Sequence, residues 1–136
     1  MSLLSWLLVL ILPLASEPSI EKIEDESLVS LMNSLENTHI YRNEIIAVSI
    51  FKKGNPPGSA GFSGGHEISH SYYLAVSEFD EYPAQSLFLI GGFYNPKYQA
   101  ESQKDHVMMT VEYGPYNDRK NISYKITLAE VSVHTP

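Results

Sequence analysis

The feature that most restricts the fold of this chain is a series of short segments rich in β-branched and aromatic residues, each bounded by turn-forming residues. The clearest segment runs from Ile122 to Leu128, where every second residue is apolar and the residues between them are polar. A pleated strand sends alternate side chains to opposite faces. This alternation therefore predicts a strand with one buried and one solvated face.

Other segments have the same character, and two positions within them predict local irregularities. The Gly91-Gly92 pair predicts a bulge or a close approach of two backbones. A change of alternation between Leu128 and Val131 predicts a β-bulge near residues 129–130. We expect antiparallel strands at residues 41–52, 71–79, 86–94, 107–113 and 122–133.

One helical pattern precedes the strands. The apolar residues from Leu28 to Leu35 have the spacing of residues on one face of a helix. This spacing predicts a helix over residues 27–36. No helical pattern alternates with the strands, which argues against a parallel sheet. The predicted fold is mainly β, an antiparallel β-sandwich or curved meander of about five strands with one N-terminal helix. The alternative is an α+β fold in which the helix packs on an antiparallel sheet.

The N-terminus has the pattern of an export signal. Leu3–Ala15 is almost wholly apolar, and no charged residue precedes Glu17. A run of this length is too short to span a bilayer, which needs about 20 residues, but it suits the core of a signal peptide. We therefore predict a signal peptide at residues 1–16, a single globular β-rich domain at 17–136, and a secreted or periplasmic location. No stable membrane insertion is expected after signal removal; an uncleaved N-terminal anchor is the alternative.

Composition restricts the chemistry and the partners. The 136 residues suffice for one domain, and they include no cysteine. Disulfides, thiolate zinc sites and cysteine nucleophiles are therefore excluded. The formal net charge of −7 repels phosphate backbones, so nucleic acid is not an expected partner, whereas a basic protein is favoured.

The segment from His66 to His70 matches the H-E-x-x-H pattern of zinc hydrolases. In those enzymes the two histidines lie one helical turn apart on a shared metal, and the glutamate activates water. Gly64 and Gly65 disfavour a helix here, and on a strand residues 66 and 70 would lie about 13 Å apart. We therefore expect no metal, cofactor or catalytic residue. The alternative is Zn²⁺ held by His66 and His70, with Glu67 as the general base.

A long loop and several aromatic residues are the candidates for molecular recognition. Residues 54–65 include five glycines and two prolines, and loops this long in small domains are often functional. Aromatic side chains near loops provide large contact areas with few rotatable bonds. The predicted binding residues are Phe62, Tyr94, Tyr98, Tyr113 and Tyr116.

These features together favour an exported, non-enzymatic binding module that recognises another protein, as an inhibitor, an immunity factor or a surface-recognition domain does. An acidic module gains from electrostatic steering toward a basic partner. The alternatives are a small zinc-dependent hydrolase that uses the H-E-x-x-H pattern, and a structural component of the cell envelope.

Processing of the N-terminus is directly testable. We expect the mature chain to begin between Ser16 and Ser19, because the apolar run ends in the small residues that precede cleavage. Intact-mass measurement of the native protein checks this expectation. A mass that still includes Met1 or Ser2 would contradict it.

Overall fold

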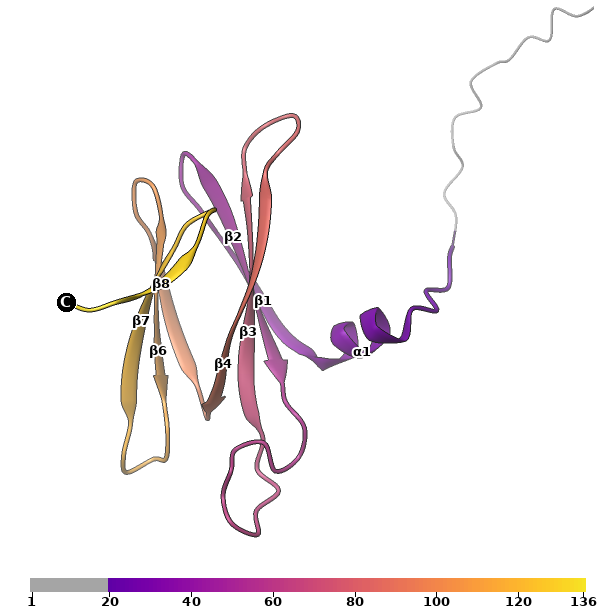
Figure 1. Cartoon of the computed structure of the whole chain (residues 1–136), viewed down its shortest axis with the longest axis vertical. Coiled ribbons are helices and arrows are strands. Elements are labelled where there is room, and N and C mark those ends of the chain that lie inside the picture. The colour runs from indigo at the N-terminus through magenta and orange to yellow at the C-terminus, as the bar shows by residue number, and fades with distance from the viewer. Residues whose placement is uncertain (1–19) are drawn as a thin grey trace, which may run out of the picture.

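The computed structural model describes residues 20–136, in which one helix precedes eight strands (Figure 1). The predicted signal peptide lies outside the described residues. The elements are α1 (Glu26–Ser34), β1 (Leu35–Arg42), β2 (Ile46–Gly54), β3 (Ser69–Glu78), β4 (Gln85–Tyr94), β5 (Lys97–Ser102), β6 (Val107–Tyr113), β7 (Lys120–Ile126) and β8 (Val131–His134).

The strands form two antiparallel sheets that pack face to face. Sheet A has the order β1-β2-β3-β4 and sheet B the order β5-β6-β7-β8, so that each sheet is a simple meander. Figure 1 shows the two layers, with α1 extending from the side of sheet A. The predicted mainly β, antiparallel architecture with a single helix is confirmed.

The core lies between the two sheets and comes from alternate residues of the central strands. In sheet A, Val48 of β2 and Leu74 of β3 are completely buried, and in sheet B the same holds for Val107 and Met109 of β6. Their neighbours in sequence point to the opposite face because side chains alternate along a strand. The remaining buried apolar residues are Ile46, Ile50, Tyr72, Val76, Phe93, Val111 and Ile126.

Helix α1 begins and ends close to its predicted limits. Its N-cap is Asp25, whose side chain accepts a hydrogen bond from the Leu28 N–H at 3.1 Å. The helix ends because Leu35 adopts an extended conformation and begins β1, so the last predicted helical residues belong to a strand. Within residues 20–136, the structure contains no helix of the length and apolarity needed to cross a membrane.

Two predicted strands each prove to be two strands joined by a tight turn. Residues 41–52 are interrupted at Asn43, whose side-chain oxygen accepts hydrogen bonds from the N–H groups of Ile45 and Ile46 at 2.8 Å and closes the β1–β2 turn. Residues 122–133 are divided by a turn in which the Thr127 N–H donates to the Glu130 carbonyl. The change of alternation there marks a reversal of the chain, not the predicted bulge.

A further strand, β5, was not predicted because its sequence is polar and lies at a sheet edge. The expected irregularity at Gly91-Gly92 is confirmed. The pairing of β3 with β4 shifts register between His70 and Ser71. Gly91 has φ 138°, and a Cβ atom there would lie 2.7 Å from the Ser71 Cα. The two backbones therefore approach at a distance that only glycine permits.

The packing of the core predicts how stability depends on its residues. Leu74→Ala should lower the free energy of unfolding by about 2–5 kcal/mol, because it leaves a cavity in a completely buried layer. Val133→Ala, at an exposed position of β8, should change it by less than about 0.5 kcal/mol. Urea denaturation measures both values. Equal losses would contradict the assignment of Leu74 to the core.

Candidate functional site

Three chain connections meet at one end of the sandwich, which we call the loop end. They are the β2–β3 loop (residues 55–68), the β4–β5 turn (95–96) and the β6–β7 turn (114–119). The Gly114 N–H donates a hydrogen bond to the Tyr94 carbonyl at 2.8 Å and joins two of them. A cavity of about 220 Å³ lies between the loop and the β6–β7 turn, lined by Ser59, Tyr94, Tyr113 and Asp118 among others.

The glycine-rich loop is held in place by hydrogen bonds near its base. The Asn55 amide donates to the hydroxyls of Ser69 and Ser71 at 2.9 and 3.0 Å. The Ser59 hydroxyl accepts from the Ser69 N–H at 2.8 Å. These bonds provide partners for Ser69 and Ser71, which are buried at the start of β3. Buried polar groups are nearly always hydrogen-bonded in folded proteins.

Four of the five predicted binding residues lie at the loop end. Phe62 packs edge-on against Tyr94, with ring centroids 4.7 Å apart. Tyr113 packs against the core residue Phe93 at 5.1 Å. Tyr116 lies in the β6–β7 turn and is 96% exposed. The loop end therefore gathers aromatic residues from three separate connections, although most of them pack against other rings.

Tyr98, the fifth predicted binding residue, lies apart from this group. It belongs to β5 and points between the sheets, where its ring contacts those of Tyr72 at 5.3 Å and Tyr41 at 6.5 Å. Its hydroxyl is buried, and the Tyr41 side chain interacts with it. Burial raises the pKa of Tyr98, and burial together with the Glu36 carboxylate raises the pKa of Tyr72 to about 12. Tyr98 thus packs against the core while remaining partly exposed.

The H-E-x-x-H segment does not form the helix that the zinc motif requires. His66 and Glu67 lie in the loop and are exposed, whereas His70 lies in strand β3. The His70 Nε2 pairs with the Glu36 Oε1 at 2.9 Å, and the Lys52 Nζ lies 3.5 Å from the other oxygen of Glu36. Within residues 20–136, no three His, Asp or Glu side chains gather closely enough to hold a metal ion.

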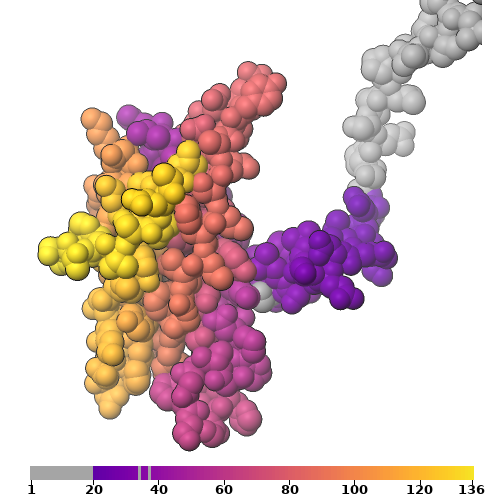
Figure 2. Space-filling model, in the orientation of Figure 1, coloured from indigo at the N-terminus to yellow at the C-terminus, as the bar shows by residue number. Residues whose placement is uncertain are grey.

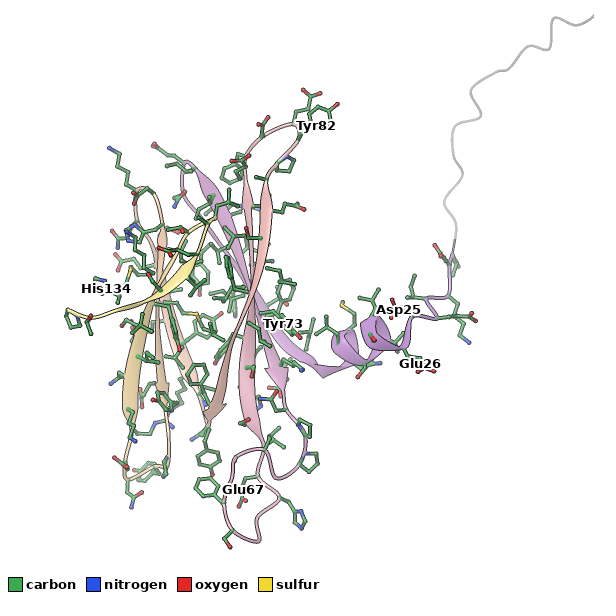
Figure 3. The ribbon with its side chains drawn as sticks, viewed as in Figure 1. Asp25, Glu26, Glu67, Tyr73, Tyr82 and His134 are labelled. Atoms are coloured by element: carbon green, nitrogen blue, oxygen red, sulfur yellow. The ribbon has the colours of Figure 1, made fainter. Side chains whose placement is uncertain are left out.

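A second candidate surface, outside the predicted binding residues, is the β3–β4 connection, residues 79–84, which we call the hairpin tip. It projects beyond the other connections at its end of the sandwich, with Tyr82 at its extremity (Figure 3). Tyr82 is 85% exposed, and Phe79 is also exposed. Acidic residues next to a proline, as at this position, are common in turns.

The hairpin tip carries acidic side chains next to its aromatic ones. Asp80 accepts a hydrogen bond from the Glu81 N–H at 2.6 Å, and Glu78, just before the tip, accepts one from the Ala84 N–H at 3.0 Å. In the part of the chain that the structure describes, no cation lies within ion-pair distance of these three carboxylates. The tip therefore presents uncompensated negative charge beside exposed aromatic rings.

Comparison with known proteins identifies no matching family model, no matching curated protein and no matching solved structure. The fold defines the class: an antiparallel β-sandwich made of two four-stranded meanders. A function for this sandwich has to be inferred from its surfaces, since fold alone does not determine function.

The buried tyrosines predict a loss of stability at alkaline pH. Their folded-state pKa values lie above the ordinary value of 10, so the folded protein retains protons that the unfolded chain releases. The free energy of unfolding should therefore be independent of these groups below pH 10 and fall as the pH rises from 10 toward 12. Urea denaturation across this range measures the effect.

Tyr98→Phe tests the contribution of one residue to this effect. It should reduce the alkaline loss, because phenylalanine has no hydroxyl to ionise, and it should leave stability at neutral pH nearly unchanged, because the ring packing against Tyr72 is retained. Tyr116→Phe, at an exposed position, should change neither property. A clear loss of stability in Tyr98→Phe at neutral pH would show that the hydroxyl makes a stabilising contact.

Proposed function

We propose that this chain is an exported, non-enzymatic binding module that recognises another protein through the hairpin tip. The observation that supports this most directly is the combination of Tyr82 and Phe79, both exposed, with the unpaired carboxylates of Asp80 and Glu81 on a projecting hairpin. A projecting segment of this kind fits a concave surface on a partner better than a flat one.

The aromatic residues of the tip suit binding because of their size and their support. Tyrosine is enriched among the residues that dominate binding energy at interfaces. The tip is held by paired strands up to its base: Ser77 pairs with Gln85, and the Glu78 N–H donates to the Ala84 carbonyl at 3.2 Å. A loop that is already ordered loses less conformational entropy on binding than a flexible one.

The charge of the tip indicates a basic partner. Asp80 and Glu81 have the same sign as the net charge of −7 carried by the whole chain. Complementary charge accelerates encounter with a positively charged surface and makes the association rate sensitive to salt. An inhibitor or immunity factor that binds a basic exported protein has this combination of properties.

The alternatives have weaker support. A zinc-dependent hydrolase would need His66 and His70 on one helix face, and these residues lie in a loop and a strand. The loop end is a second candidate contact surface. Its rings are largely engaged, however, since Phe62 packs on Tyr94 and Tyr113 on Phe93. Tyr116 is the residue of this group that is almost fully exposed, which makes it a suitable control.

Site-specific photo-crosslinking tests the proposal while the partner is still unidentified. A photoreactive phenylalanine analogue in place of Tyr82 should crosslink to a discrete protein in the exported fraction of the host, because Tyr82 lies at the centre of the proposed contact. The same analogue in place of Tyr116 should not. Mass spectrometry identifies the product. We expect the captured protein to be basic.

Point variants then measure what the tip contributes. Tyr82→Ala should weaken binding of the identified partner by about 2 kcal/mol or more, because Tyr82 is the central contact, whereas Tyr116→Ala should leave it unchanged. Added salt should slow association of the wild type more than that of an Asp80→Asn/Glu81→Gln variant. Crosslinking only from position 116 would indicate that the loop end is the binding surface. Crosslinking from neither position would contradict both candidate surfaces.

A further inference from the structure

The edge strands of the two sheets differ in how they protect their unpaired backbone groups. These strands are β1 and β4 in sheet A and β5 and β8 in sheet B. Natural proteins keep edge strands short or place charged residues in them, because a long uncharged edge can pair with another chain. β1 contains Glu36 and Arg42, β5 contains Lys97 and Glu101, and β8 has only four residues. These three edges are therefore protected against pairing.

β4 lacks these protections along most of its length. It runs for ten residues, Gln85–Tyr94, and contains no charged residue. Leu87 and Leu89 are 63% and 56% exposed, although both are large and apolar. A bulge at Gly91 interrupts the regular pairing only toward the end of the strand. Residues 85–90 are therefore a regular, uncharged and partly apolar sheet edge.

Helix α1 does not cover this edge. Ser30 and Leu31 of the helix line a cavity of about 580 Å³ together with Lys53 of β2 and Tyr73 of β3, on the outer face of sheet A. Among the described residues that line this cavity, none belongs to β4. Figure 2 shows β4, in the salmon colours that follow the hairpin tip, at the surface of the molecule and apart from α1 in indigo.

The hydrogen bonds of β3 determine which backbone groups of β4 remain free. In an antiparallel sheet, successive residues of a central strand direct their N–H and C=O groups to opposite neighbours. The Phe79 N–H donates to the Ile45 carbonyl, on the β2 side, at 3.4 Å. The Glu78 N–H donates to the Ala84 carbonyl, on the β4 side, at 3.2 Å. The even-numbered residues of β3 therefore bond to β4.

The same alternation leaves three residues of β4 with free backbone groups. In the register of β3 with β4, Ser86 and Phe88 lie opposite even-numbered residues of β3 and bond to them. Gln85, Leu87 and Leu89 therefore direct their N–H and C=O groups away from the sheet. Within residues 20–136, no backbone hydrogen bond from another element reaches these three residues. The free groups and the exposed leucines thus belong to the same positions.

The inner side of β4 is fixed to sheet B, which keeps this edge in place. Ser86 lies opposite the buried Val76, so its side chain points between the sheets. Its hydroxyl donates a hydrogen bond to the Leu128 carbonyl, in the β7–β8 turn, at 2.6 Å. An edge that is already ordered loses less conformational entropy on binding than a flexible segment does.

The free groups of β4 are complementary to those of a second β4. In an antiparallel pair centred on Leu87, this residue lies opposite Leu87 of the second copy, and Gln85 lies opposite Leu89. All three free residues are then hydrogen-bonded, because each such pair exchanges two bonds. The pairing ends on both sides of this segment, since Pro83 has no N–H to donate and Gly91 lies in the bulge.

Charge favours an antiparallel arrangement of two copies. Asp80 and Glu81 of the hairpin tip precede β4, and like charges that face each other destabilise a pair of strands. Antiparallel pairing places the two acidic tips at opposite ends of the contact, whereas parallel pairing would bring them together. Each chain carries a net charge of −7, but the paired segment itself has no charge that would repel its copy.

We propose that two copies of this chain associate through β4, which pairs with itself about a two-fold axis at Leu87 and joins the two A sheets into one. Leu87 and Leu89 then pack against Leu87 and Gln85 of the other copy. Each copy uses its β4 edge once, so the assembly closes at two copies. Each hairpin tip lies outside the paired residues 85–89, so dimerisation does not use the contact proposed for Tyr82.

Sedimentation equilibrium on the protein expressed from its full-length sequence tests the proposal. The contact is only one strand wide, so the wild type should dimerise with a Kd on the order of micromolar. Leu87→Lys and Leu87→Glu should each raise this Kd about 10-fold or more, because each places two like charges opposite each other at the axis. Ile40→Lys is the matched control and should leave the Kd unchanged, since Ile40 is 53% exposed on the other edge strand of the same sheet.

Mixing the two charged variants separates β4 pairing from any other dimer. An equimolar mixture of Leu87→Lys and Leu87→Glu should form a heterodimer at lower concentration than either variant dimerises alone, because opposite charges then face each other at the axis. Urea midpoints confirm that each variant is folded. A mixture that associates no better than its components would overturn the proposal, as would a wild type that is monomeric at its highest soluble concentration.

Amide hydrogen exchange, measured by NMR on the wild type, tests the pairing without any substitution. The N–H groups of Ser86 and Phe88 should exchange slowly at every concentration, because they bond to β3. Those of Leu87 and Leu89 should exchange rapidly in the monomer and more slowly once the concentration exceeds the Kd. Rapid exchange at Leu87 and Leu89 in a protein that has dimerised would show that another surface joins the copies, and would contradict the proposal.

Discussion

The packing of two sheets through alternate apolar residues is the interaction on which the rest of the structure depends. Val48 and Leu74 in sheet A and Val107 and Met109 in sheet B are completely removed from water. With no cysteine, the chain lacks the disulfides on which many small extracellular domains rely. Its 136 residues are enough for one apolar layer to supply the stabilisation instead. The ends and outer faces of the sandwich are therefore available for interactions.

The sequence predicted best those features of the fold that are determined within a single strand. Period-two alternation identified β6 and most of β3 and β4, and the paired glycines identified the bulge at Gly91, because each of these is decided within one strand. The turn at Asn43 was missed because it lies inside a run that looks continuous, and the change of alternation near residues 129–130 was interpreted as a bulge although it marks a turn. β5 was missed because its residues at the sheet edge are polar, and edge strands need only one buried face.

The same holds for the candidate sites: only the features that depend on neighbouring residues in the sequence were predicted. Phe62, Tyr94, Tyr113 and Tyr116 were correctly expected near loops, because strand ends are local features. Whether a ring faces solvent or the core depends on the opposite sheet, which the sequence does not specify. Tyr98 therefore packs against the core, and the exposed aromatic residues of the hairpin tip were not among the predicted binding residues.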